Sequence, residues 1–224
     1  MKRTFCVALT ATLLFCSALE AAPVSGRVSF VTKRGQRPNP AETLVSLEAI
    51  GAKSPKRAAA AFQMATRGKT LLPHIMVIPA GSTVTFPNQD PISHNLFSLS
   101  PASQFDLGLY RAGAGKTQKF QAPGVVNVYC NVHPNMSAVV HVMTTPYYTL
   151  ADAKGGFVLD VPPGRYKLTA WNEVGGSIEG VIDLAANGAV SGNTLLTIDS
   201  RNHRTDTHMN KEGKPYRAPV SKDY

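Results

Sequence analysis

The sequence predicts an all-β protein made of two consecutive β-sandwiches. Eighteen glycines and sixteen prolines in 224 residues are many for a helical protein, and they suit short strands joined by turns. Short segments rich in β-branched side chains recur along the chain, with Gly, Pro or Asn between them. We find no convincing helical period.

The N-terminal 22 residues have the order of a secretory signal. Lys2 and Arg3 precede an apolar run over residues 4–19, and the small residues Ala21 and Ala22 follow after Glu20. The apolar run is too short to span a bilayer well, and no later segment approaches the length of a transmembrane helix. We therefore expect residues 1–22 to be a cleaved signal peptide and the protein to be exported to the periplasm.

Residues 23–60 are expected to form an N-terminal β extension with strands at 27–31 and 44–50 and basic loops. Residues 23–70 contain nine Lys and Arg against two acidic side chains. Such an excess favours an acidic protein or an anionic surface as partner, or is only a solvated basic face. An exported protein is a poor candidate for binding nucleic acid.

Residues 61–145 are predicted to form the first sandwich. In its strand 125–130, alternation directs Val126, Val128 and Cys130 to one inward face. Further strand-like segments lie at 61–66, 75–78, 82–86, 119–121 and 137–143.

Residues 146–200 are predicted to form a second, smaller sandwich, and residues 201–224 a tail. The strands of the second sandwich alternate with turns rich in Gly and Pro. The tail is polar, basic and nearly free of aliphatic side chains, so we expect it to be disordered.

The cysteine count isolates one thiol. Cys6 and Cys16 leave with the signal peptide, so the exported chain retains Cys130 alone. A single thiol in an oxidising compartment cannot form an internal disulfide. It is either a buried, inert side chain or a thiolate occupied by a ligand.

One short segment gathers three side chains that bind soft metals. It reads Cys130-Asn-Val-His133-Pro-Asn-Met136 and places a thiolate, an imidazole and a thioether within seven residues. Two imidazoles and one thiolate in a plane, with a weak axial thioether, describe an electron-transfer copper site. We expect the strand region 84–86 to pair with 125–130 and thereby bring a second imidazole to the sulfur. The predicted copper ligands are His94, Cys130, His133 and Met136.

Three other interpretations of these residues stay open. Zinc also accepts one Cys and two His, although Met is a poor fourth ligand for it. A nucleophilic Cys–His pair needs an exposed thiol and an orienting Asn or Asp, whereas Cys130 ends a strand close to a Met. The third interpretation is a metal-free cysteine that only packs in the core.

Residues 62–143 resemble the cupredoxins, the blue copper proteins of the plastocyanin and amicyanin kind. The spacing Cys-x2-His-Pro-x-Met is that of the short amicyanin loop. The resemblance implies a Greek-key β-sandwich that holds one type 1 copper ion through the four ligands named above. The other matching features are Pro73-His-Ile-Met-Val-Ile-Pro-Ala-Gly81-Ser-Thr-Val-Thr-Phe86, Asn88, His94-Asn95, Pro123-Gly124 and Tyr129-Cys130.

The resemblance also implies roles for the neighbours of the ligands. Asn95 is expected to tie the loops around the sulfur, with its backbone N–H donating to Cys130. His133 is the expected edge through which electrons leave, and Tyr129 offers a second route.

Residues 146–200 are similar to carboxypeptidase-regulatory-like modules of the prealbumin type, through Asp152-x2-Gly155-Gly-Phe157 and Val161-Pro-Pro-Gly164. The whole layout resembles exported proteins labelled as methylamine-utilisation proteins. The resemblance implies a carrier of single electrons, not an enzyme, that docks to a redox protein such as a cytochrome or dehydrogenase. Copper trafficking or storage is the alternative, and a structural or carbohydrate-binding role is a third.

The remaining histidines have less distinctive surroundings. His74 is expected at a turn or on the surface, and His141 at an outward strand position. His203 and His208 lie in the tail, where a weak second metal site is the alternative to no role.

Overall fold

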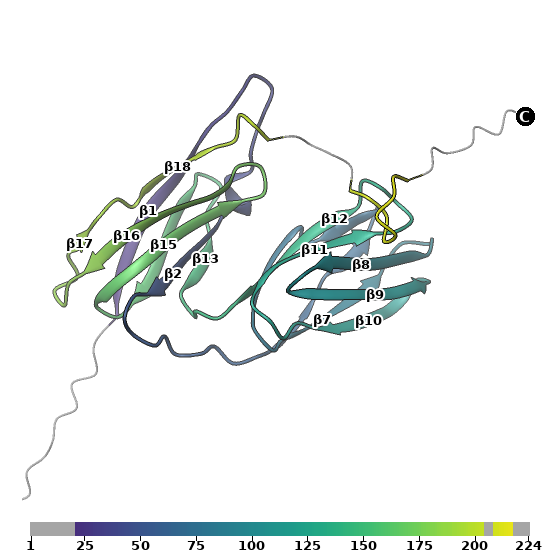
Figure 1. The fold of residues 1–224 in the computed structure, drawn as a ribbon, viewed down its shortest axis with the longest axis horizontal. Helices are drawn as coiled ribbons and strands as arrows, with labels where there is room; N and C mark the ends of the chain where they lie inside the picture. The colour runs from purple at the N-terminus through teal and green to yellow at the C-terminus, as the bar shows by residue number, and fades with distance from the viewer. Residues whose placement is uncertain (1–20, 204–207, 217–224) are drawn as a thin grey trace, which may run out of the picture.

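The computed structural model describes residues 21–203 and 208–216. Their regular structure is almost entirely β-strand, in agreement with the predicted fold class (Figure 1). A single 3-10 turn, Pro40–Glu42, is the exception in this part of the chain. No helix among the described residues is long and apolar enough to cross a membrane. The predicted signal peptide, apart from Ala21 and Ala22, lies outside the described residues.

Residues 61–143 form one β-sandwich, which we call the central sandwich. The strand orders of its two sheets are β10-β7-β4-β5, with β3 also beside β7, and β6-β12-β11-β8-β9. The first sheet contains β3 (Ala61–Gln63), β4 (Ala65–Arg67), β5 (Thr70–Leu72), β7 (Thr83–Asn88) and β10 (Gly113–Lys119). The second contains β6 (Ile75–Pro79), β8 (His94–Ser100), β9 (Ser103–Tyr110), β11 (Gly124–Cys130) and β12 (Ser137–Met143).

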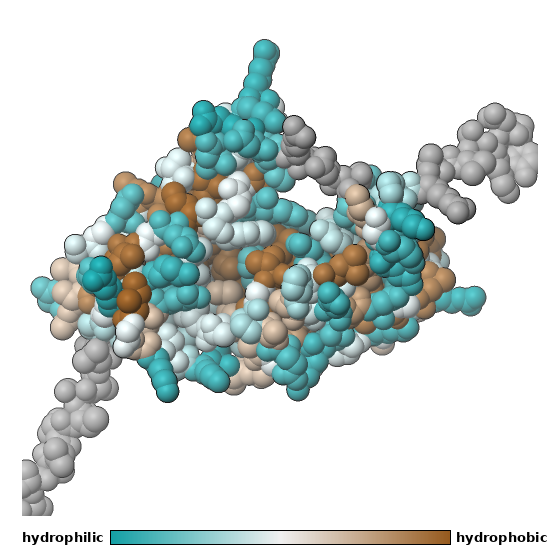
Figure 2. Space-filling view, in the orientation of Figure 1, coloured by the Kyte–Doolittle hydropathy of each residue, from teal (hydrophilic) through white to brown (hydrophobic). Residues whose placement is uncertain are grey.

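Alternating side chains of β7 and β11 contribute to the core of the central sandwich. β7 buries Val84 and Phe86 from one sheet, and β11 buries Val126, Val128 and Cys130 from the other. All five belong to one buried cluster, which confirms the inward face predicted for β11. With the apolar side chains inside, the face in Figure 2 is largely hydrophilic and carries only separate hydrophobic patches.

Eight further strands form the second sandwich, which we call the flanking sandwich. Its sheets have the orders β14-β1-β18 and β13-β2-β15-β16-β17. Both sheets contribute to a second buried cluster. The strands are β1 (Ala22–Val31), β2 (Leu44–Ala49), β13 (Tyr148–Leu150), β14 (Gly156–Val161), β15 (Gly164–Asn172), β16 (Gly176–Leu184), β17 (Val190–Ser191) and β18 (Leu195–Asp199).

The two N-terminal strands are not a separate extension, and this corrects the expectation for residues 23–60. β1 lies between β14 and β18, antiparallel to the first and parallel to the second. β2 lies between β13 and β15. The region 146–200 therefore lacks an inner strand of each sheet unless the N-terminal strands supply it. Local patterns identify a strand but not a partner more than a hundred residues away.

Side-chain contacts join the two sandwiches. The His141 ring of β12 meets the Trp171 ring of β15 edge to face, with centroids 4.2 Å apart. His74 Nε2 lies 2.6 Å from a carboxylate oxygen of Glu173. His141 does point away from its own core, but it is only 5% exposed because the flanking sandwich covers it. His141 therefore lies on the outward face of its own sheet, as expected, but it is not exposed to solvent in the whole protein.

The tail also differs from expectation. Residues 208–216 lie against the end of the central sandwich near β8 and β11 (Figure 1). Ring contacts and hydrogen bonds fix this segment even though it has few aliphatic side chains. The disorder expected for residues 201–224 is therefore wrong for 208–216, while residues 204–207 and 217–224 lie outside the described range.

Candidate metal centre

Cys130 is placed by the hairpin of β11 and β12. It is the last residue of β11, and its side chain is fully buried. Its N–H donates to the carbonyl of Met136 at 3.0 Å, while the N–H of Met136 donates to the carbonyl of His133 at 3.2 Å. These bonds close the loop 131–136 directly above the core. The His133 ring is thereby turned back toward the sulfur.

His94 reaches the sulfur from the neighbouring strand. It begins β8, and β8 pairs with β11 so that Leu96 lies opposite Cys130. The pairing that we expected, between strand 84–86 and strand 125–130, is wrong because β7 lies in the other sheet. The strand that starts with His94 itself makes the connection.

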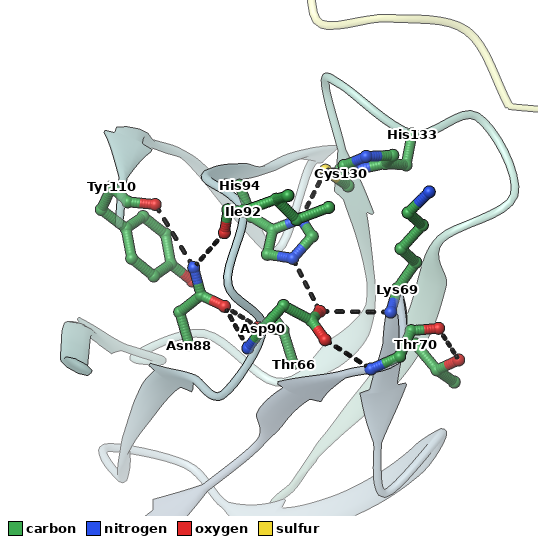
Figure 3. Close-up of polar contacts among 11 residues, drawn as sticks. Thr66, Lys69, Thr70, Asn88, Asp90, Ile92, His94, Tyr110, Cys130 and His133 are labelled. Carbon is green, nitrogen blue, oxygen red and sulfur yellow. Dashed lines mark hydrogen bonds and ion pairs between the residues drawn. The ribbon is translucent and has the colours of Figure 1, made fainter. Parts of the chain in front are cut away.

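The three side chains converge on one point (Figure 3). Cys130 Sγ lies 3.7 Å from His94 Nδ1 and 3.6 Å from His133 Nδ1, and all three ligand atoms lie within 4.8 Å of one another. Ligand atoms that share an ion at about 2.0–2.3 Å stand at such separations. One thiol and two imidazoles, each offering Nδ1, therefore fit copper or zinc by both chemistry and spacing.

Met136 lies in the same loop, and its side chain is 1% exposed within the core cluster that includes Cys130. Its assignment as a fourth, axial ligand stays a prediction.

A buried carboxylate orients His94, and sequence reasoning missed it. Asp90 Oδ2 accepts a hydrogen bond from His94 Nε2 at 2.8 Å (Figure 3). With the proton held on Nε2, the lone pair of Nδ1 faces the sulfur, an arrangement typical of metal-ligating histidines. The only local signal was the position of Asp90, four residues before His94.

Asp90 is held by the turn between β4 and β5. It accepts the N–H of Gly68 at 2.5 Å and that of Lys69 at 3.1 Å. Burial by itself raises the pKa of the Asp90 carboxyl, but the bonds from His94, Lys69 and Gly68 outweigh it and leave the pKa below its ordinary value. Asp90 is therefore an anion at neutral pH.

Asn95 links the two sides of the site. Its carbonyl accepts the N–H of Asn131 at 2.8 Å, and its side chain donates to Asp106 at 2.5 Å. Asn95 thus ties β8 to the loop after Cys130. The tie runs through its carbonyl and side-chain amide, and the expected bond from its N–H to the sulfur stays a prediction.

The two residues expected to pass electrons differ in their surroundings. His133 is partly exposed, and burial, followed by the nearby His94 and Lys69, lowers the pKa of its imidazole. It is thus neutral and able to ligate at neutral pH. Tyr129 is also partly buried, but its ring stacks on that of His208 at 4.2 Å.

His74 and His141 stand apart from this cluster. His74 bonds to Glu173 and to the carbonyl of Ser137, and His141 packs on Trp171. Within residues 21–203 and 208–216, no second group of three His, Cys, Asp or Glu side chains converges. His203 and His208 therefore form no such site in the described chain.

No protein-family model matches the chain, and no curated protein matches it. Similar solved structures include a purple cupredoxin from Nitrosopumilus maritimus, at 26% identity and TM-score 0.31 over 36% of this chain and 98% of that one. An amicyanin variant is 17% identical, with TM-score 0.35 over 44% of this chain and 99% of that one. A copper-containing nitrite reductase from Thermus scotoductus is 21% identical, with TM-score 0.35 over 52% and 28%.

Proposed function

We propose that the protein is a blue, type 1 copper protein that carries single electrons to or from a redox partner protein. The observation that carries this proposal is the convergence of His94 Nδ1 and His133 Nδ1 on the sulfur of Cys130. Together with Met136 as the proposed axial ligand, these side chains make the ligand set of electron-transfer copper.

A bound copper ion supplies a one-electron couple, and the chain supplies a rigid frame. Asp90 fixes the His94 ring, and the bond from Cys130 N–H to the Met136 carbonyl closes the ligand loop. Asn95 joins that loop to β8. Ligands braced in this way rearrange little between oxidation states, which favours fast electron exchange over substrate chemistry.

The burial of the ligands favours a carrier over a trafficking protein. His94 and Cys130 are 0% exposed. A protein that hands copper to another must present its ligands to the acceptor, whereas a carrier keeps the metal enclosed and exposes only an edge. We propose His133 as that edge because it is the partly exposed ligand of the three in the described cluster.

The setting of the protein follows from the same proposal. We propose export to the periplasm through the signal peptide and docking to a cytochrome or dehydrogenase, whose acidic surface would complement the basic residues of 23–70. Residues 61–145 would be the cupredoxin domain of a methylamine-utilisation type layout, with the flanking sandwich as its carboxypeptidase-regulatory-like partner.

The decisive experiment adds Cu(II) to the metal-free protein lacking residues 1–22. We expect an intense visible band from thiolate-to-copper charge transfer and a narrow copper hyperfine splitting in the EPR spectrum. Cys130→Ser should lose the band and keep its β-sheet circular dichroism, while His203→Ala, outside the cluster, should keep both. A colourless, folded, copper-loaded protein would contradict the proposal, and tight zinc binding without colour would support a structural zinc site.

A further inference from the structure

A C-terminal segment returns to the metal centre. Residues 208–216, which we call the C-terminal clasp, lie beyond β18 of the flanking sandwich but contact the central sandwich (Figure 1). The segment has its own folded form: the Asn210 side chain accepts the N–H groups of Glu212 and Lys214. The N–H of Asn210 also donates to the carbonyl of Lys214 at 2.9 Å. A preformed loop loses less entropy on docking than a flexible one.

The first attachment is aromatic. The His208 ring stacks on Tyr129, with centroids 4.2 Å apart and planes inclined by 18°. The Tyr216 ring also contacts the His208 ring, edge to face, with centroids 5.2 Å apart. Tyr129 directly precedes Cys130, so this stack covers the strand that carries the thiol.

The second attachment is to the backbone around the thiol. The Tyr216 hydroxyl donates to the carbonyl of Cys130 at 2.5 Å. The N–H of Lys211 donates to the side-chain oxygen of Asn131 at 2.9 Å. Two consecutive residues of the ligand loop are thus held by the clasp.

The third attachment reaches the other side of the site. Lys211 Nζ lies 2.8 Å from Asp106 Oδ2, and Asp106 Oδ1 accepts from the side chain of Asn95, the neighbour of His94. Burial by itself raises the pKa of the Asp106 carboxyl, but Lys211, Asn95 and the N–H of Gly108 lower it, to about 2. The ion pair is therefore present throughout the neutral range.

We propose that the C-terminal clasp is a positioning element of the metal centre, which holds the Cys130–Met136 loop in ligating geometry and shields the thiol before metal arrives. The shielding is independent of the proposed copper function, whereas an effect on the copper spectrum rests on it. Because His208 of the clasp stacks on the Tyr129 ring, the clasp covers Tyr129. A redox partner would therefore dock at His133 and not at Tyr129.

The test measures how fast iodoacetamide alkylates Cys130 in the metal-free, folded protein lacking residues 1–22, in which Cys130 is the sole cysteine. The double variant His208→Ala/Tyr216→Phe removes the ring stack and the hydroxyl. We expect its alkylation to be about tenfold faster, because losing these contacts favours opening of the loop by about that factor. Met209→Ala, in the same segment but 57% exposed, is the matched control and should leave the rate unchanged.

A second measurement separates the clasp from the copper proposal. In copper-loaded protein, the double variant should widen the hyperfine splitting and release copper faster to a chelator, again with Met209→Ala unchanged. An unchanged alkylation rate in the double variant would overturn the inference, even if the wild-type spectrum is that of a type 1 site. If the double variant unfolds, judged by Trp171 emission, Tyr216→Phe alone decides the question, since it removes one hydroxyl.

Discussion

Asp90 has the clearest individual role in the site. It is 5% exposed, anionic, and bonded to the ring nitrogen of His94 that faces away from the sulfur. Such partners raise the basicity of a ligating imidazole and fix its orientation. A negative charge this close to the site also favours the more highly charged state of a bound metal.

If the site binds copper as proposed, the change Asp90→Asn should therefore weaken Cu(II) binding and raise the reduction potential of the bound copper. The amide keeps the size of the side chain but loses the negative charge. It also places an NH2 group, itself a donor, close to the N–H groups of Gly68 and Lys69. We expect affinity for Cu(II) to fall by about 10- to 100-fold, measured by chelator competition, and the midpoint potential to rise in voltammetry. An affinity within threefold of wild type would exclude a tuning role for Asp90.

His141 predicts a pH dependence of stability. Burial lowers the pKa of its imidazole to about 4, against about 6.5 in an unfolded chain, and its Nε2 has no hydrogen-bond partner. Between these values the unfolded chain binds a proton that the folded chain does not. The contribution of neutral His141 to the free energy of unfolding is therefore fully present above pH ~6.5. It is lost as the pH falls toward 4, which lowers the free energy of unfolding by up to about 3 kcal/mol.

Urea unfolding of metal-free wild type and His141→Leu at pH 7.5 and 4.5 measures this effect. We expect the free energy of unfolding to fall less in the variant, because Leu has no proton to bind. Equal pH dependence in both proteins would mean that His141 is solvated in solution.

At the scale of elements, the close packing of β1 depends on a glycine. A Cβ built on Gly26 would stand 2.3 Å from the Thr194 carbonyl oxygen and 2.5 Å from the Phe157 ring. Gly26 therefore lets β1 fit between β14 and β18. In contrast, a Cβ on Gly180 of β16 would meet nothing within 4 Å.

We expect Gly26→Ala to destabilise the protein by about 1–3 kcal/mol through overpacking. Gly180→Ala should be neutral or slightly stabilising, because Ala loses less backbone entropy than Gly. Denaturant midpoints of the two variants test the pair directly. A neutral Gly26→Ala would argue against the observed packing of β1.

The same scale explains what the sequence can and cannot predict. Cys130, His133 and Met136 stand in one loop, so their chemistry is readable from local spacing. The donors that hold Asp90 come from the turn at Gly68 and Lys69, between two strands of the sheet that also contains β7, the strand just before Asp90. Their approach depends on the pairing of β4 with β7, and no local pattern encodes that pairing. The partners of β1 and β2 were missed for the same reason.

At the scale of the molecule, the pair of His74 and Glu173 couples the two sandwiches. The hydrogen bond that His74 donates to the Glu173 carboxylate raises the pKa of His74 despite the opposing effect of burial. A histidine with a raised pKa stabilises the fold below its unfolded pKa, and this contribution is lost as the pH rises through the folded value. Both side chains are partly solvated, so we expect about 0.5 kcal/mol.

Glu173→Gln should lower the pKa of His74, measured from the NMR shifts of its ring protons between pH 5 and 9. The free energy of unfolding of the wild type should decrease slightly between neutral and alkaline pH, and this decrease should be absent in the variant. Glu179→Gln, an exposed change in β16, is the control. An unchanged His74 titration would mean that the two sandwiches do not meet at this point in solution.

The position of β1 has a consequence for biosynthesis. The described strands of the central sandwich find all their sheet partners within residues 61–143, so this unit can be complete while later residues are still being synthesised. β1 is synthesised before the other described strands, but its neighbours β14 and β18 are synthesised late. β1 therefore cannot pair with both of them until nearly the whole chain has been made. Such long-range closure is slow, and chains stopped before β14 should leave β1 exposed and prone to aggregate.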